Sequence, residues 1–158
     1  MAQTMHARNA VSAKMAECYV TIEGNRYNFM SAIDLEVRFA KSKTSVPILG
    51  RMNRGHKATG SEITGKAKFH FNTSVWRELA YRFQETGEDV YFDMQICNED
   101  ITASDIGRQT IILYDCNWDE ILLAAFDADS DDVLTEDIDF TAERFELPEK
   151  FNAMDGMM

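Results

Sequence analysis

Apolar and polar residues alternate along several short stretches of the chain, which is the pattern of β-strands with one buried and one solvated face. The alternation is clearest at residues 32–40, where every second residue from Ile33 to Phe39 is apolar and the residues between them are charged. Similar patterns, or apolar runs of strand length, occur at residues 17–23, 65–71, 90–96, 109–118, 121–126 and 137–147. The pattern predicts about seven strands. Gly24 and Asn25 suit a tight turn that joins the first strand to a return strand at residues 32–40.

One segment has the apolar spacing of an amphipathic helix. Thr73 or Ser74 can cap its start, and Gly87 suits the position just after its end. Glu78 and Arg82 are four residues apart, a spacing that allows an ion pair on one helix face. The apolar stripe consists of Val75, Trp76, Leu79, Ala80 and Phe83. The sequence therefore predicts a single helix that packs on the strands.

The alternation stops at residues 41–61, which form a basic, glycine-rich segment with a short apolar stretch. About twenty residues without secondary structure are unusual in a compact domain, and such loops are commonly functional or disordered. Three uses remain open: an ordinary solvated loop, an arm that binds nucleic acid, and an arm that docks on a neighbouring copy. The candidate contact residues are Val46, Pro47, Ile48, Leu49, Gly50, Arg51, Arg54, Gly55, His56, Lys57 and Gly60.

The length of 158 residues predicts a single domain that can bury a core without disulfide bonds. Many strands in one domain create unpaired edges, which are removed by closure into a barrel or reduced in a two-sheet sandwich. The fold class is therefore predicted to be mainly β: a small antiparallel β-barrel or sandwich with one packed amphipathic helix and a long inter-strand loop. Residues 1–15 are predicted to form an N-terminal arm, and residues 152–158 a frayed C-terminus.

Charge is distributed unevenly along the chain. The formal net charge is −11, which opposes tight binding to a phosphate backbone. Residues 1–86 hold 13 Lys and Arg against 7 Asp and Glu, giving +6, whereas residues 87–158 hold 3 against 20, giving −17. The separated charges can attract two copies head to tail, or the two halves can interleave within one fold.

The acidic stretch at residues 126–140 begins like a calcium-binding EF-hand loop but does not continue as one. Its sixth position needs a glycine and holds Asp132, and its twelfth needs a glutamate and holds Ile138. Both flanks are predicted to be extended instead of helical. The acidic turn contains Asp127, Asp129, Asp131 and Asp132. A solvated turn between strands is the favoured interpretation, and a calcium-binding module is a minor alternative.

No group of residues in the sequence predicts catalysis, a bound metal or a cofactor. His6, His56 and His70 lack partner ligands at metal-binding intervals. The three cysteines fall within predicted strands, where buried, inert thiols are expected, and their odd number without a CxxC pair fits a reducing compartment. No apolar run has the length of a membrane span, and the first residues lack a hydrophobic signal core, so synthesis in the cytoplasm is expected.

Two long stretches resemble the tail tube proteins of contractile phage tails, including those of defective prophages and phage-tail-like bacteriocins. The first is VPILGRMNRGHKATGSEITGKAKFHFNTS, and the second is GEDVYFDMQICNEDITASDIGRQTIILYDCNWD with its sequels FDADSDD and FELPEKF. The similarity covers roughly residues 19–151, and the glycines and basic residues at 50–65 are its most specific part.

This resemblance implies that six copies form a ring and that rings stack into a tube inside a sheath, in a virion tail or tail-like particle made in a bacterial host. It implies partnership with sheath, tape measure and baseplate initiator proteins, with DNA as a passenger in the channel. The loop at residues 41–61 would contact a neighbouring subunit or ring and become ordered on assembly. The acidic stretch would face a neighbour or the channel, with Asp137, Asp139 and Glu143 as further candidates for an acidic wall. The tube of a type VI secretion system is the nearest alternative.

Overall fold

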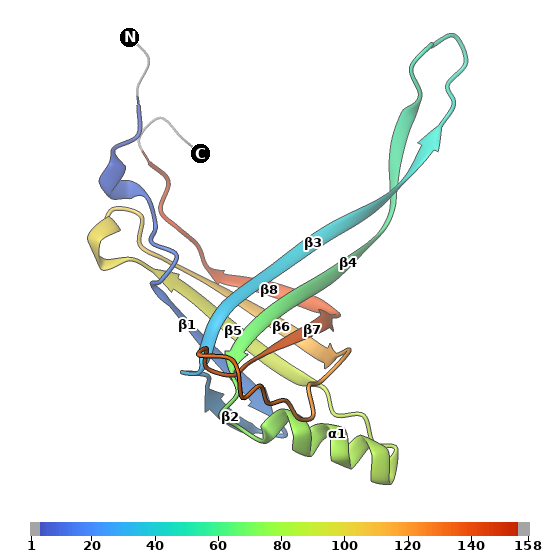
Figure 1. The fold of residues 1–158 in the computed structure, drawn as a ribbon. Coiled ribbons are helices and arrows are strands. Elements are labelled where there is room, and N and C mark those ends of the chain that lie inside the picture. The colour runs from blue at the N-terminus through green and yellow to red at the C-terminus, as the bar shows by residue number, and fades with distance from the viewer. Residues whose placement is uncertain (1–3, 155–158) are drawn as a thin grey trace.

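A computed structural model describes residues 4–154 as a mainly β structure with one α-helix (Figure 1). The strands are β1 Ala16–Ile22, β2 Asn25–Asn28, β3 Ala32–Val46, β4 Gly55–His70, β5 Phe92–Glu99, β6 Arg108–Trp118, β7 Thr135–Ala142 and β8 Arg144–Glu149. The helix α1 spans Val75–Thr86, and two 3-10 turns, η1 Ala7–Asn9 and η2 Ile101–Ala103, complete the elements.

The strands form two antiparallel sheets that share β6. The first sheet has the order β2-β1-β5-β6, with β8 paired to the first part of β6. The second contains the end of β6, then β7, β4 and β3. Within the described residues β3 pairs only with β4, so the sheets do not close into a barrel. Of the two predicted architectures, the sandwich is therefore the observed one.

The chain changes sheets at two bends. Asp115 in β6 has a left-handed backbone, with φ of 53°, and its N–H donates to Asp93 Oδ1 at 3.2 Å. Glu143 interrupts the predicted strand at residues 137–147, dividing it into β7 and β8, and its N–H donates to the carbonyl of Tyr114 at 3.1 Å. Such corners are the usual way in which strands pass from one sheet of a sandwich to the other.

Two predicted strand assignments are wrong. The turn at Gly24 leads into β2, and β3 pairs with β4 instead of returning beside β1. Residues 121–126 have no regular secondary structure, although their apolar run has the length of a strand. An apolar run alone does not distinguish a strand from an irregular segment that packs part of its side chains on the core.

Aromatic side chains make up the centre of the core. Trp76 packs against Phe29, Phe69 and Phe92 with ring centroids 5.6, 5.7 and 5.4 Å apart, and Phe92 lies 6.3 Å from Phe140. All five side chains are buried. Because the five residues come from the β2–β3 connection, β4, α1, β5 and β7, this cluster joins both sheets and the helix.

The helix α1 begins and ends close to the predicted positions. Trp76 and Leu79 of the predicted stripe are buried, and Gly87 has φ of 72° with its N–H donating to the carbonyl of Phe83 at 2.9 Å. The Ser74 side chain makes no capping hydrogen bond. The predicted ion pair within the helix is wrong, because Arg82 instead pairs with Glu23 at the β1–β2 turn.

Arg77 joins α1 to β7 and to the segment that precedes it. Its guanidinium donates to Glu136 Oε2 at 2.6 Å and to the carbonyl of Leu122 at 2.9 Å, and it lies 4.2 Å above the Phe71 ring. The Glu136 side chain is fully buried. The sequence showed Glu136 as one more acidic residue, but its charge is paired inside the protein.

The termini of the described chain converge on the η2 turn. The Ser12 N–H donates to Asp100 Oδ2 at 2.8 Å, and the Asn152 N–H donates to the carbonyl of Ile106 at 2.7 Å. Hydrogen bonds from the Thr102 hydroxyl and from backbone N–H groups, including that of Ser12, lower the pKa of Asp100. Both terminal segments are thus attached at one place, including the start of the segment predicted to fray. The remainder of the two terminal predictions, at residues 1–3 and 155–158, lies outside the described residues.

The three cysteines are free and buried, as their positions in strands predicted. Burial, with a smaller effect of Cys97, raises the pKa of Cys18 to about 12. Burial, with smaller effects of neighbouring acidic groups, also raises the pKa of Cys116 to about 12. Since the thiolate is the reactive form, burial and the raised pKa values both disfavour reaction of Cys18 and Cys116 near neutral pH.

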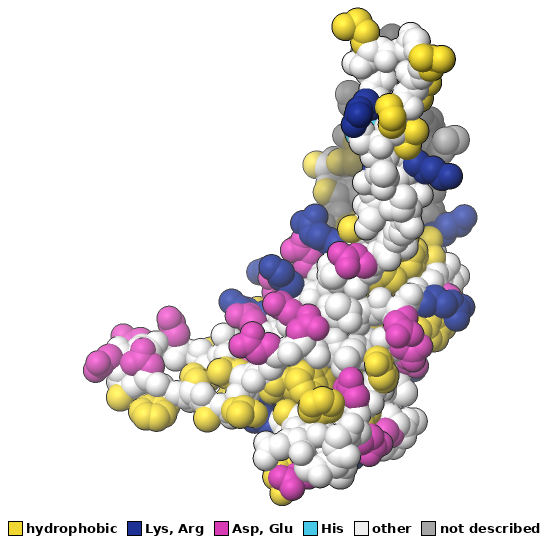
Figure 2. Space-filling view, turned by 90° about the vertical axis from the view of Figure 1, so that its right-hand side faces the viewer, with side chains coloured by type: hydrophobic (Ala, Val, Ile, Leu, Met, Phe, Trp, Pro, Cys, Tyr) yellow, Lys and Arg dark blue, Asp and Glu magenta, His cyan; other side chains and the backbone are white. Residues whose placement is uncertain are grey.

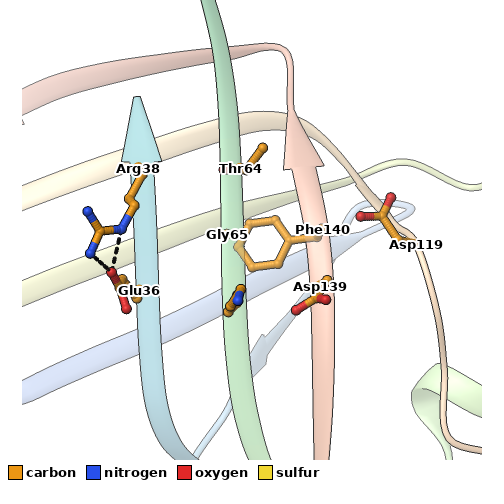
Figure 3. A pocket seen from close by; sticks show the side chains of 8 residues that line it. Glu36, Arg38, Thr64, Gly65, Asp119, Asp139 and Phe140 are labelled. Atoms are coloured by element: carbon orange, nitrogen blue, oxygen red, sulfur yellow. Dashed lines mark hydrogen bonds and ion pairs between the residues drawn. The ribbon is translucent and has the colours of Figure 1, made fainter. Parts of the chain in front are cut away.

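Gly65 is required because the Phe140 ring occupies the space of a side chain at this position (Figure 3). A Cβ atom there would meet the two Cε atoms of Phe140 at 2.7 and 2.8 Å. We expect Gly65→Ala to lower the free energy of unfolding in urea by about 1–3 kcal/mol, the usual cost of overpacking. The control is Gly60→Ala, where nothing lies within 4 Å of the new Cβ. Equal stability of the two variants would contradict the packing described.

The Arg77–Glu136 pair makes a second stability prediction. Arg77→Met leaves a buried carboxylate without its cation, so we expect a loss of about 3 kcal/mol in the free energy of unfolding. Arg82→Met breaks the pair with Glu23, which is partly exposed on both sides, and should cost less than about 1 kcal/mol. The double variant Arg77→Met/Glu136→Met should recover most of the loss. An Arg77→Met variant no less stable than Arg82→Met would refute the role of this pair.

Candidate assembly surfaces

Within residues 4–154, no strand pairs with the outer edge of β3, which is 15 residues long. A free edge presents backbone N–H and C=O groups that another strand can pair with. The inner side of β3 is also incompletely covered: a groove of about 350 Å³ lies between β3 and the first sheet. Its walls include Val37, Ile111 and an edge-to-face pair of partly exposed rings, Phe39 and Phe145, 5.6 Å apart. The sandwich is therefore open on the β3 side.

The strands β3 and β4 continue beyond the sandwich as a two-stranded ribbon, which we call the hairpin, residues 40–61 (Figure 1). Pairing extends to Val46 opposite Gly55, so the turn is confined to residues 47–54. Much of the predicted loop at residues 41–61 is thus strand. The sequence did not reveal this, because both faces of the ribbon are exposed and no inward-facing residues create an alternating pattern.

The hairpin carries exposed apolar side chains at its tip and basic side chains along its length (Figure 2). Leu49 and Met52 are fully exposed, and Ile48 and Val46 are partly so. The predicted apolar tip consisted of residues 46–49 and did not include Met52. The remaining predicted contact residues, from Gly50 to Gly60, all lie in the turn or the adjoining strand ends, and Gly50 has φ of 82°.

Residues 119–134 form an irregular segment, which we call the acidic arm. The Asp119 N–H donates to the carbonyl of Asp139 at 2.8 Å, and the Phe71 N–H donates to the carbonyl of Leu134 at 3.1 Å. The Arg77 guanidinium donates a hydrogen bond to the carbonyl of Leu122. These contacts fix both ends of the arm and leave its middle to project into solvent.

The predicted acidic turn lies in the projecting middle of this arm. The Asp127 side chain accepts the Asp129 N–H at 3.1 Å, and the Ser130 hydroxyl accepts the Asp132 N–H at 3.1 Å. All four predicted carboxylates, including Asp131, are exposed. Within residues 4–154, no three His, Cys, Asp or Glu side chains come together in an arrangement that could hold a metal ion.

The arm also exposes apolar side chains that sequence reading did not identify. Phe126 is 93% exposed, Val133 72% and Leu123 67%. The predicted strand at residues 121–126 would have placed alternate side chains in the core. Their exposure on a segment that is anchored at both ends marks a surface suited to contact another protein.

The outer face of the second sheet carries interleaved charges. The strand register places Lys66 between Glu36 and Asp139, and Lys68 between Asp34 and Asp137. Asp137 and Asp139 are exposed on one face, whereas Glu143 lies at the bend after β7. The structure therefore brings two of the three predicted wall residues together, beside lysines of β4. The acidic turn belongs to the arm, a different part of the surface.

The three histidines are exposed: His56 lies in the hairpin, His70 lies at the end of β4 on the same face as Lys66 and Lys68, and His6 lies outside these surfaces. None of the helices within the described residues has the length and hydrophobicity needed to cross a membrane.

Comparison with known proteins identifies the family. The family model described as "Phage tail tube protein" matches residues 3–149. Phage-like element PBSX protein XkdM of Bacillus subtilis (strain 168) is 34% identical over 148 residues, covering 94% of this chain and 97% of the relative.

The fold is also shared with solved structures of injection particles. A chain of the anti-feeding prophage baseplate matches with a TM-score of 0.66 and 13% identity, covering 93% of this chain and 97% of that chain. A chain of an extracellular contractile injection system, in its extended sheath-tube complex, matches with a TM-score of 0.63 and 12% identity, covering 89% and 93%. The mainly β sandwich, the match over nearly the whole sequence and the similarity to XkdM together show that this chain belongs to the phage tail tube protein family.

Proposed function

We propose that this protein polymerises as stacked hexameric rings into the inner tube of a contractile phage tail or tail-like particle. The observation that carries this proposal is the long unpaired edge of β3 beside an open groove, in a chain of the tail tube family. A strand edge that is a liability in a monomer becomes stable when a neighbour extends the sheet. A contact between two different surfaces closes into a ring when its rotation divides the circle evenly.

The solved structures support the symmetry and the principal partner. The anti-feeding prophage baseplate is described as 6-fold symmetrised, and the contractile injection system structure as a sheath-tube complex. We infer by analogy that six copies form each ring and that a sheath protein surrounds the tube. Tape measure and baseplate initiator proteins complete the expected set of partners, and the channel delivers DNA or serves the puncturing action of the particle. The role is structural, without catalysis.

The interleaved charged face of the second sheet is our candidate for the channel wall. Its other face is the protein core, so this broad polar surface is available to water. Each of Lys66 and Lys68 has a carboxylate opposite on both neighbouring strands. Lysines compensated in this way bind phosphate weakly, and the surplus of carboxylates repels it. A passing DNA would therefore slide instead of adhering.

The test is electron microscopy of the purified protein, concentrated at low salt, with mass by light scattering. We expect rings or hollow tubes, and a reconstruction should place Asp137 and Asp139 on the channel surface. A reconstruction that places them at a subunit contact or on the outer surface would refute the channel assignment alone. If the protein stays monomeric even with the baseplate initiator proteins added, the tube proposal itself is wrong.

A further inference from the structure

The hairpin and the acidic arm carry opposite charge. Residues 40–61 contain five Lys and Arg and no Asp or Glu, whereas residues 119–134 contain six Asp and Glu and no Lys or Arg. Elsewhere on the second sheet the charges are interleaved. Segregated charges of opposite sign attract over about 10 Å at moderate salt and orient the approach of two molecules.

Each of the two surfaces also has exposed apolar side chains. Leu49 and Met52 at the hairpin tip are fully exposed, and the arm exposes Leu123, Phe126 and Val133. An apolar centre with a charged rim is the usual composition of a specific protein interface. Burying apolar side chains of this size against one another lowers the free energy of association.

The hairpin and the arm of one copy lie apart. In Figure 1 the hairpin tip is at the top, and the orange segment between β6 and β7 runs along the lower part of the molecule. Figure 2 likewise shows acidic side chains at the end of a projection on the left, well separated from the top of the hairpin. The paired strands of the hairpin and the anchored ends of the arm hold them in these places. The complementary surface must therefore come from a second copy.

We propose that the hairpin tip of one copy docks on the acidic arm of another copy. Hairpin and arm are different surfaces, so the contact runs head to tail. In a pair of copies one hairpin and one arm remain free, and each of them can bind a further copy. Basic residues Arg51, Arg54 and Lys57 lie against the carboxylates of the arm, and Leu49 and Met52 lie against Phe126. This inference rests on the proposed tube and names the contact that holds its subunits in order.

A charge swap tests the proposal. Arg51→Glu/Arg54→Glu/Lys57→Glu reverses the charge of the hairpin around its tip, and Asp127→Lys/Asp129→Lys/Asp131→Lys reverses the charge of the acidic turn. We expect each triple variant to reduce the yield of pelleted tubes at least about tenfold. A chain that carries all six changes should assemble again, as should an equal mixture of the two triple variants, and high salt should weaken wild-type assembly.

The matched control for the hairpin variant is Arg8→Glu/Lys14→Glu/Lys150→Glu, which changes the net charge by the same amount and in the same direction at exposed positions outside both surfaces. It should assemble as the wild type does, and thermal unfolding of every variant verifies that it folds. Normal tubes from both triple variants, or failure of the six-change chain to recover, would overturn the docking proposal.

Cross-linking provides an independent readout. The native thiols are buried, so a cysteine placed at Leu49 or at Phe126 will be the accessible one. Mixing Leu49→Cys and Phe126→Cys chains with a short bismaleimide under assembly conditions should give mainly the mixed dimer. Tyr81→Cys, on the exposed side of α1, is the control partner and should give little product. If wild-type tubes form and no mixed dimer appears, the docking proposal fails while the tube stands; if no tubes form, the proposed function fails first.

Discussion

Within the part of the chain that the structure describes, the unpaired backbone edge of β3 is what separates this fold from a closed barrel. Its N–H and C=O groups face outward along a strand of 15 residues, because the second sheet ends there and nothing in the described chain continues it. A closed barrel would have removed this edge. Instead the chain turns its corners at Asp115 and Glu143, where β6 and the β7–β8 segment pass between the sheets and leave the opposite side open. An open sandwich with a stable core is a unit prepared for association.

The distribution of charge follows the same division between core and contact. On the outer face of the second sheet, lysines of β4 alternate with carboxylates of β3 and β7, so this face attracts no partner strongly. In the two projecting segments the charges are segregated, positive on the hairpin and negative on the arm. The net charges of the two halves of the chain, +6 for residues 1–86 and −17 for residues 87–158, are therefore arranged in two ways in the structure. The halves interleave within the second sheet and separate in the hairpin and the arm.

Sequence patterns predicted the strands and the helix that have one buried face and one exposed face. Ile138 and Phe140 alternate with exposed residues as expected, and Trp76 and Leu79 mark the buried side of the helix. The resemblance to tail tube proteins supplied the family, which composition and spacing alone did not.

The features that the sequence did not predict are those in which no alternation of buried and exposed side chains marks the structure. The hairpin has no buried face, so it read as an unstructured loop. The apolar run at residues 121–126 predicted a strand. The hydrogen bond from Arg77 to the carbonyl of Leu122, which helps to hold this segment in its irregular path, has no local signature in the sequence. The burial of Glu136 likewise depends on a cation 59 residues away in sequence. In each case the deciding contact is tertiary.

Amide hydrogen exchange on the free and assembled protein, followed by mass spectrometry of peptides from β3, measures whether the edge of this strand joins the subunits. In the free chain the amides of the outer edge exchange rapidly, because their N–H groups face solvent. We predict that assembly slows exchange across β3, while residues 63–70 of β4, already paired on both sides, change little. If β3 exchanges equally fast in assembled tubes and in the free chain, its edge is not what joins the subunits.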